Sequence, residues 1–430
     1  MPPSSPRPPT PAIVVEHRKE LSYLLCQAAE IEHLAMCQYL YASFSLRTTP
    51  GPGLTVEQLE AVERWRRELG RIAAEEMLHW ALVNNLLTAI GSAPFVSRPD
   101  LPHRAKGYPP SVQFALLPFG EDALHHFVYF ERPEDVALED VDAFAPVGDA
   151  PPPMAPGELQ PRGQDFETQG QLYRSLEVGL RHLAETLGEE GLFIGPPWAQ
   201  ATPKSFGWPE LVPVTDLASA LEVLDRIVVQ GEGAPADSAS SHYARFRRVL
   251  DELVAMRAVD PSFEPAQPVS AAIVRTVEGG EPTGPWITDA TTAAVSDLFN
   301  VVYDLILQML CRYFAFGHET GEQHAALADA TVSLMVGATR PLGTLLAVLP
   351  VGYGAPDLTA GANFQLAYKS NFLLPHRRVA WIRFSERLDE AAAFAETIPA
   401  EGETRRVLDA VARSLRDSLV RLSAHIEEVS

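Results

Sequence analysis

Apolar residues recur at spacings of three and four along most of this 430-residue chain, whereas strict alternation of apolar and polar residues is scarce. The spacing places apolar side chains on one face of an α-helix, so the sequence predicts an all-α protein. The expected helices cover residues 19–46, 56–90, 166–187, 216–230, 241–257, 289–316 and 325–349, with two more between residue 376 and the C-terminus.

Irregular segments divide this helical pattern. Residues 91–164 are dense in proline and contain one expected short helix at 121–131, and residues 188–214 form a second irregular stretch. Long ordered loops are often functional, so we expect these inserts to cover the helices as a lid or wall. A third break, at 260–284, gives three parts: a Pro-rich disordered leader (1–16), a helical bundle with inserts (17–260), and a C-terminal helical region (285–430) packed on the bundle.

Charge and cysteine content limit the partners and the compartment. The chain has 56 Asp and Glu against 34 Lys and Arg, a net charge of -22, which disfavours nucleic acid and anionic membranes. Its three cysteines form no CxxC pair, as expected in a reducing cytoplasm. The longest apolar stretch, 298–316, contains Asp304, Gln308 and Arg312, so we expect no membrane span.

Charged residues occupy the centres of three of the predicted apolar stripes. In the second helix, Glu76 and His79 interrupt a stripe that is otherwise apolar, and they are spaced as Glu-x-x-His. Glu32 lies at the centre of the stripe of the first helix, and Glu177 lies within that of the third. Burying such groups without partners costs several kcal/mol. The alternatives are a rotated helix, a structural ion pair or, for Glu177, a core face formed by the neighbouring row of leucines.

Two further residues extend this set. His242 begins the stripe of the helix at 241–257, and Glu232 lies between two glycines just before it. An inward histidine is either a core residue or a metal ligand. Carboxylates and imidazoles without thiolates suit iron or manganese better than structural zinc. The sequence therefore predicts that Glu32, Glu76, His79, Glu177, Glu232 and His242 converge on one or two metal ions.

Several short strings, in their order along the chain, resemble the ferritin-like family. They are Glu-Ile-Glu-His at 30–33, Glu-Glu-Met-Leu-His at 75–79, Gln-Gly-Glu-Gly at 230–233 and Ser-His-Tyr-Ala-Arg-Phe at 241–246. More narrowly, they are similar to the ferritin-like half of the group containing iminophenylpyruvate dimer synthase and chromopyrrolate synthase. The resemblance implies a four-helix metal-binding bundle, with Glu32, Glu76, His79, Glu232 and His242 as ligands, and oxidation of an amino-acid-derived imine.

Two departures from that group are visible. The named synthases are much longer and have an additional N-terminal half that this sequence does not contain. Where their relatives carry Gly-Glu-Phe-Tyr, this chain has Gly-Gln-Leu-Tyr at 170–173, so that Gln171 replaces a carboxylate. The second metal position therefore depends on another acid, and Glu177 is the expected substitute.

The function that these observations favour is a non-haem iron enzyme, with one or two iron ions per chain or with manganese. We expect it to activate O2 or peroxide and to oxidise a small, amino-acid-derived substrate in specialised metabolism, as an oxidase or oxygenase. Tyr173 and Tyr243 are the candidate catalytic residues, as donors of a proton or an electron. The inserts, with Trp198, Phe206 and Trp208, would wall off an apolar substrate pocket.

Two other classes of function remain open. One is a ferritin-like protein that oxidises iron or scavenges peroxide without an organic substrate. The other is a non-catalytic partner subunit with a degraded site. The apolar C-terminal helices either pack on the bundle or form the face of a homodimer.

Overall fold

The protein is all-α in the computed structural model, which describes residues 13–103, 113–134, 136, 166, 168–231, 238–274, 284–315, 317–366 and 373–426. The described helices are α1 (Arg18–Ser45), α2 (Val56–Ala89), α3 (Glu121–Phe130), α4 (Gln169–Leu187), α5 (Glu189–Leu192), η2 (Pro197–Ala199), α6 (Leu217–Gln230), α7 (His242–Val259), α8 (Ala290–Phe314), α9 (Gly321–Leu334), η3 (Met335–Thr339), α10 (Arg340–Leu346), α11 (Arg377–Thr397) and α12 (Gly402–Ser423). Two short strands, β1 (Val269–Ser270) and β2 (Thr359–Ala360), pair in parallel.

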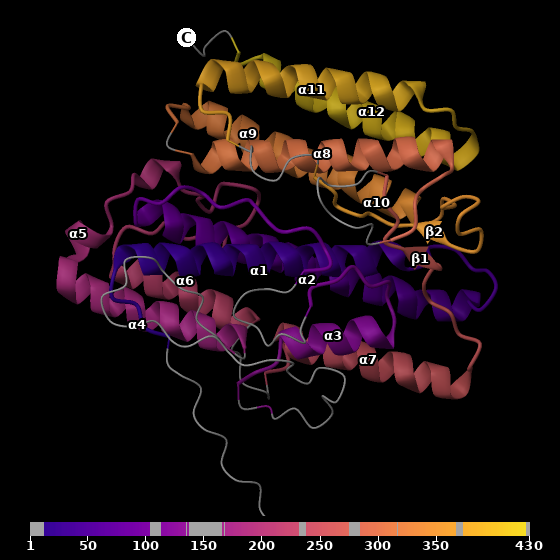
Figure 1. Ribbon diagram of the computed structural model, residues 1–430, viewed down its shortest axis with the longest axis horizontal. Coiled ribbons are helices and arrows are strands. Elements are labelled where there is room, and N and C mark those ends of the chain that lie inside the picture. Colours follow the sequence, from indigo (N-terminus) through magenta and orange to yellow (C-terminus); the bar gives the residue numbers. More distant parts are fainter. Residues whose placement is uncertain are drawn as a thin grey trace, which may run out of the picture.

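The long helices α1 and α2 form the middle of the molecule and lie side by side along its length (Figure 1). Both begin with a capping box, formed by His17 and Glu20 in α1 and by Thr55 and Gln58 in α2, which satisfies backbone N–H groups of the first turn. At 28 and 34 residues they span about 42 and 51 Å. Each is long enough to carry a site at its centre, far from both helix ends.

Four shorter helices complete the bundle on one side of α1 and α2. The pair α4 and α6 covers one half of their length, and the pair α3 and α7 covers the other (Figure 1). Helix α6 ends at Gln230 and α7 begins at His242, while α3 ends at Phe130 and α4 begins at Gln169. The ends of these short helices therefore meet near the middle of the bundle, where polar groups can be brought inside.

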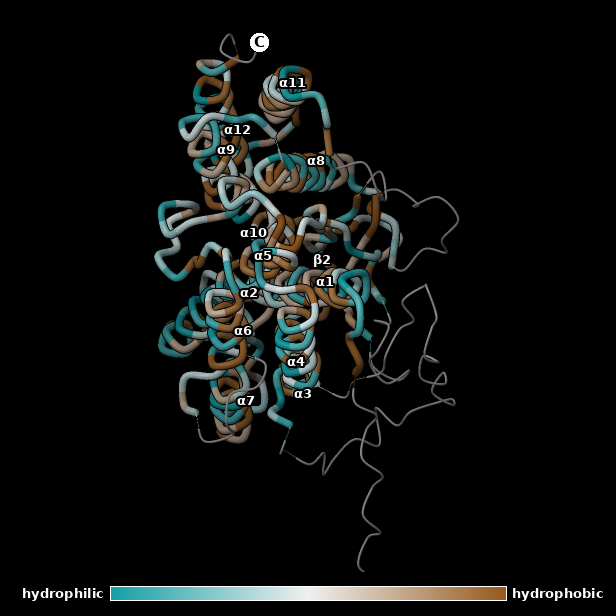
Figure 2. Tube along the Cα trace, turned by 90° about the vertical axis from the view of Figure 1, so that its left-hand side faces the viewer, coloured by the Kyte–Doolittle hydropathy of each residue, from teal (hydrophilic) through white to brown (hydrophobic). Residues whose placement is uncertain are grey.

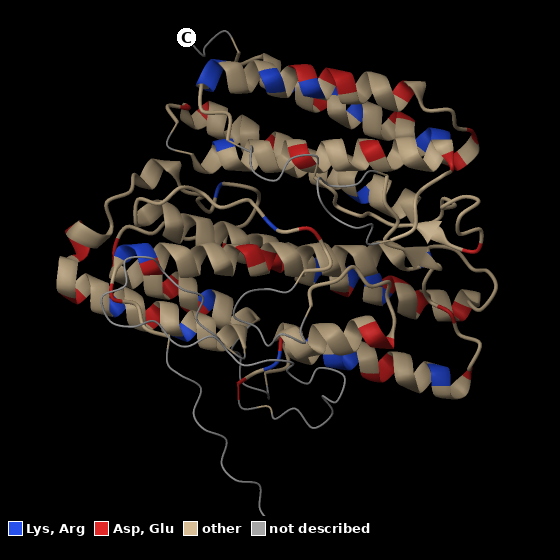
Figure 3. Cartoon of the chain, in the orientation of Figure 1, with Lys and Arg blue, Asp and Glu red and all other residues tan. Residues whose placement is uncertain are grey.

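The C-terminal helices α8–α12 form a layer on the opposite side of α1 and α2, and Figure 2 shows it edge-on. Two glycines allow this layer to approach the bundle closely. A Cβ atom at Gly343 of α10 would overlap the ring of Phe44, and one at Gly361 would overlap the ring of Tyr41. Charged residues gather on α11 and α12, which lie farthest from the bundle (Figure 3).

The helices lie close to the positions predicted from the sequence, including the short helix at 121–131. The helix expected at 325–349 is α9, η3 and α10 in succession, with a π-helical segment in its middle. By length and hydropathy α8 could cross a membrane, but 67% of its apolar window is buried inside the protein, as in a core helix. The first twelve residues of the expected leader and residues 137–165 lie outside the described residues.

Candidate metal centre

Five fully buried side chains converge where the short helices meet the centres of α1 and α2. They form two groups of three potential ligands, Glu32–Glu76–His79 and Glu76–Glu131–His242. Within each group, one ligand atom from each residue lies within 4.8 Å of the other two. Such a separation allows three side chains to bind one cation.

Glu76 of α2 belongs to both groups and offers a different oxygen to each. Its Oε2 lies 3.6 Å from Nδ1 of His79, which is itself 3.5 Å from Oε2 of Glu32. Its Oε1 lies 2.8 Å from Nδ1 of His242, which is 3.4 Å from Oε2 of Glu131. This is the arrangement expected of a carboxylate that bridges two metal ions in a helical bundle.

The outer nitrogens of both imidazoles are hydrogen-bonded, which sets the direction of the inner ones. His79 Nε2 donates to Gln230 Oε1 at 3.0 Å, and His242 Nε2 donates to Glu75 Oε2 at 2.9 Å. Arg245 in turn forms an ion pair with Glu75. A metal-binding histidine characteristically donates its other N–H to such a partner, which fixes the tautomer and the ring orientation. The Nδ1 atoms of both rings thereby face the carboxylates.

Two buried tyrosines hold the outer carboxylates of the cluster. Tyr173 of α4 donates a hydrogen bond to Glu32 Oε1, and Tyr39 of α1 donates one to Glu131 Oε1. In both carboxylates the other oxygen is the one directed at a histidine Nδ1. Each tyrosine therefore orients a carboxylate and leaves one of its oxygens available to a cation.

The electrostatics of the cluster favour a cation. Burial raises the pKa of the Glu131 carboxyl, and the charge of Glu76 raises it further. Burial alone would lower the pKa of His242, but Glu76 and Glu131 raise it well above its ordinary value. Burial would likewise raise the pKa of Glu76, but His242 and His79 bring it below the ordinary value. Positive charge close to Glu76 thus stabilises the carboxylate form.

The donor atoms themselves fit metal ions. Both oxygens of Glu76, Glu131 Oε2 and His242 Nδ1 are buried and form no hydrogen bond of normal geometry with the described residues. Buried polar atoms are otherwise almost always hydrogen-bonded, so a convergent set of such atoms needs an explanation. Three carboxylates and two imidazoles without a thiolate match the preferences of iron and manganese. The residues present therefore fit a two-metal site.

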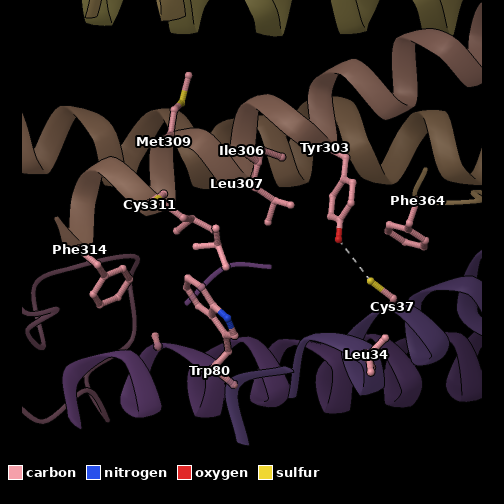
Figure 4. Close-up of a cluster of buried hydrophobic side chains, with 14 of the residues drawn as sticks. Leu34, Cys37, Trp80, Tyr303, Ile306, Leu307, Met309, Cys311, Phe314 and Phe364 are labelled. Carbon is pink, nitrogen blue, oxygen red and sulfur yellow. Dashed lines mark hydrogen bonds between the residues drawn. The ribbon is translucent and has the colours of Figure 1, made fainter. Parts of the chain in front are cut away.

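An apolar pocket of about 680 Å³, measured out to open solvent, adjoins the cluster on the side of the C-terminal layer. Glu32 and Glu76 form part of its wall, together with Trp80. Figure 4 shows Trp80 extending from α2 into the space below α8, where Ile306 and Leu307 lie. The remaining lining residues are His33, Met36, Leu40, Met77, Ala81, Phe206, Trp208, Leu310, Met335, Thr339 and Phe364. The pocket therefore offers a small apolar molecule an apolar surface beside Glu32 and Glu76.

The structure brings together four of the six metal ligands predicted from the sequence: Glu32, Glu76, His79 and His242. It does not bring Glu177 to the cluster. This side chain is 42% exposed on α4 and forms an ion pair with Arg181 at 2.8 Å, because Leu172, Leu176 and Leu183 form the buried face of that helix. The expectation that Glu177 is a ligand is therefore wrong.

Three other predicted positions have different outcomes. Glu232 lies outside the described residues, although a Cβ atom at the preceding Gly231 would come within 3.1 Å of His242 Nδ1. Tyr173 contacts Glu32, as described above. Tyr243 is half-buried on α7, and no hydrogen bond joins it to the ligands described here. Instead of Tyr243, it is Tyr39 that donates a hydrogen bond to Glu131, as Tyr173 does to Glu32.

Glu131 is the clustered side chain that sequence reasoning missed. It follows the apolar helix α3 directly and is fully buried at that helix's C-terminal end. A carboxylate at this end faces the negative pole of the helix dipole, so burial there is unfavourable unless a cation or a donor compensates for it. A carboxylate at the C-terminal end of an apolar helix could therefore have pointed to Glu131 from the sequence. Glu131 supplies the acid that Gln171 and Glu177 do not.

Replacing Glu131 with glutamine is expected to reduce bound metal from two equivalents per chain to one. The change removes a ligand from the Glu76–Glu131–His242 group, keeps an acceptor for Tyr39 and leaves the other group intact. Metal analysis after loading with Fe(II) and desalting measures this. The matched control is Glu134→Gln, since Glu134 lies three residues on and pairs with Arg174 at the surface. Two tightly bound equivalents in the Glu131 variant would contradict the assignment.

The fold and this centre define an all-α protein with a cluster of carboxylates and histidines inside a helical bundle that could hold metal ions. A family model described as ferritin-like matches residues 25–251, which include all five clustered side chains. The chain therefore belongs to the ferritin-like family, and the resemblance seen in its sequence is confirmed.

Similar proteins include enzymes of biosynthesis. The chain is 30% identical over 92% of its length to a dichlorochromopyrrolate synthase of Lentzea aerocolonigenes. It is 29% identical over 80% of its length to a 2-imino-3-(indol-3-yl)propanoate dimerase of Chromobacterium violaceum. The alignments cover only 40% and 34% of those two relatives. A crystal structure of a ferritin-like protein from Caulobacter vibrioides is similar at a TM-score of 0.49, with 18% identity, over 80% of this chain and 99% of that one.

Proposed function

We propose that this protein is a non-haem di-iron oxidoreductase that oxidises a small aromatic, amino-acid-derived molecule with O2 or peroxide. The observation that carries the proposal is the shared position of Glu76, whose two oxygens face two separate groups of buried ligands. A structural ion pair would need only one such group. Two metal ions in adjoining positions could together give or take up the two electrons of an oxidation at one place.

Bound iron would supply Lewis acidity and a store of electrons close to the substrate. The side chains described above orient the groups that would hold the iron. Gln230 and Glu75 accept hydrogen bonds from Nε2 of His79 and His242, so that each Nδ1 faces the cluster and can bind a metal in place of a proton. Tyr173 and Tyr39 donate to the outer oxygens of Glu32 and Glu131, and each phenol is placed to give or receive a proton at that oxygen.

The pocket supports an aromatic substrate. Its walls are aromatic and aliphatic side chains with three methionines, and its polar groups are few. Such walls favour a flat apolar ring over a sugar, a phosphate or a free metal ion. The named activities of the two relatives concern chromopyrrolate and an indolyl imine, which are molecules of this kind. Because the chain spans less than half of each relative, their complete reactions are not assigned to it.

The burial of the cluster supports oxidation rather than hydrolysis. Glu76 is fully buried, and Trp80, Phe206 and Trp208 line the pocket beside it. Trp80 Nε1 donates to Phe95 O at 3.1 Å, which fixes its ring. Excluding water protects reactive species and strengthens the electrostatic interactions of the site. The insert at 188–214 thus lines the pocket through Phe206 and Trp208, whereas Trp198 is exposed and is not among the lining residues.

An anaerobic Fe(II) titration of the metal-depleted chain tests the metal part of the proposal. We expect two equivalents bound per chain, and fewer than one equivalent would refute it. The enzymatic part is tested by O2 consumption of the iron-loaded protein with an imine generated from tryptophan. Consumption that depends on the imine supports the proposal. Rapid iron oxidation unaffected by the imine would instead identify an iron-oxidising protein without an organic substrate.

A further inference from the structure

Three irregularities of the backbone border the same pocket. Among the described residues that are not glycine, Phe206 and Phe364 have positive φ angles, of 57° and 50°. The third irregularity is the π-helical segment η3, whose first and last residues, Met335 and Thr339, also line the pocket. Left-handed backbone at a bulky residue is strained, and π-turns interrupt helices frequently at functional sites. Their coincidence at one pocket indicates that its shape is under functional constraint.

The π-turn has a cause in the sequence. Pro341 follows it, and a proline inside a helix has no N–H to donate to the carbonyl four residues back, here that of Gly337. The helix widens at this point, and Arg340 N–H donates to Met335 O, five residues back. Gly337 also fits closely against α12, since a Cβ atom there would overlap the side chain of Ser414. The π-turn is thus held by Pro341 within its own helix and by the close contact of Gly337 with α12.

The widened turn leaves the hydroxyl of Thr339 without a partner. A helical threonine commonly donates to the carbonyl one turn back, as Thr331 does to Leu327 O at 2.8 Å. The Thr339 side chain is only 7% exposed, and its Oγ1 has no hydrogen-bond partner among the described residues. A buried hydroxyl without a partner destabilises a fold, so its presence in the wall of an apolar pocket needs a reason. A ligand that completes the hydrogen bond is such a reason.

We propose that Thr339 is the residue by which the pocket recognises the polar group of its aromatic ligand. Its hydroxyl hydrogen-bonds an N–H or other polar atom on the ring, while Trp80, Phe206 and Phe364 contact the ring itself. Recognition then lies in the C-terminal layer, beyond residues 25–251, opposite the metal ligands of the bundle. The inference deepens the proposed function, because it takes this pocket as the substrate site.

The test compares indole with 1-methylindole, which lacks the N–H, by calorimetric titration of the full chain as purified. We expect the wild type to prefer indole by about tenfold, the magnitude of one hydrogen bond. Thr339→Val should abolish this preference without lowering the unfolding temperature, because it removes a hydroxyl that has no partner in the free protein. Thr339→Ser keeps the hydroxyl and should retain the preference.

Thr331→Val is the matched control. It removes a buried hydroxyl that is already bonded within α9, so it should lower the unfolding temperature and leave the preference for indole unchanged. The proposal is overturned if neither probe binds, if Thr339→Val keeps the preference, or if that variant loses as much stability as Thr331→Val. Iron stoichiometry is measured in a separate experiment. A chain that bound indole with the expected preference but bound no iron would refute the proposed function and leave the inference about Thr339 intact.

Discussion

Replacing Glu76 with glutamine is expected to abolish tight binding at both metal positions, although only one residue is changed. Each group would keep two ligands, Glu32 and His79 in one and Glu131 and His242 in the other. Losing a hydrogen-bond partner of a ligand typically weakens metal binding by 10- to 100-fold, so losing a shared charged ligand should weaken both sites by more than about 100-fold. Glutamine has nearly the same volume, and the helical content should therefore be unchanged.

The measurement is an anaerobic Fe(II) titration together with far-UV circular dichroism of the same sample. Glu177→Gln is the control, because Glu177 carries the same charge on a neighbouring helix but pairs with Arg181 at the surface. We expect two equivalents in the control and fewer than one in the Glu76 variant. If the Glu76 variant retained one full equivalent, Glu76 would serve a single site and the bridging arrangement would be refuted.

The clustered residues that the sequence predicted have a common physical basis. Glu32, Glu76 and His79 lie at the centres of long stripes whose flanking residues are apolar over several turns. A stripe of that length fixes which face of the helix is buried, whatever the rest of the fold does. Glu177 lies on a 19-residue helix with two competing apolar rows, and there periodicity alone could not decide which row faces inward. In the structure the row of leucines faces the core.

The residues that were missed depend on interruptions of regular structure. Glu131 reaches the centre because α3 ends there, and Thr339 loses its usual partner because a π-turn precedes Pro341. The periodic pattern of the sequence gives no direct measure of either feature. Both arise where helices from distant parts of the chain meet, so their partners become visible only when the fold is assembled. The all-α class and the bundle, by contrast, follow from local periodicity.

The C-terminal layer contributes seven of the 17 residues that line the pocket, so its rigidity matters for the proposed chemistry. In the last turn of α8, Arg312 is paired with Glu319, at 3.0 Å between Nη2 and Oε2, and both side chains are almost fully buried. Arg312 Nη1 also donates to Pro375 O, and Trp381 of α11 donates to Glu319. This pair therefore joins α8, the segment before α9 and the start of α11.

Replacing Arg312 with methionine is expected to destabilise the protein by about 3–5 kcal/mol, because Glu319 would remain buried without its cation. The double variant Arg312→Met/Glu319→Leu should be more stable than the single one, since no buried charge is left uncompensated. Urea unfolding followed by circular dichroism measures both. Arg416→Met is the matched control: Arg416 pairs with Glu396 between α11 and α12, both side chains are about half exposed, and the expected loss is below about 1 kcal/mol. Equal losses for Arg312→Met and Arg416→Met would show that the buried pair does not hold the layer together, and the pocket wall would then depend on apolar packing alone.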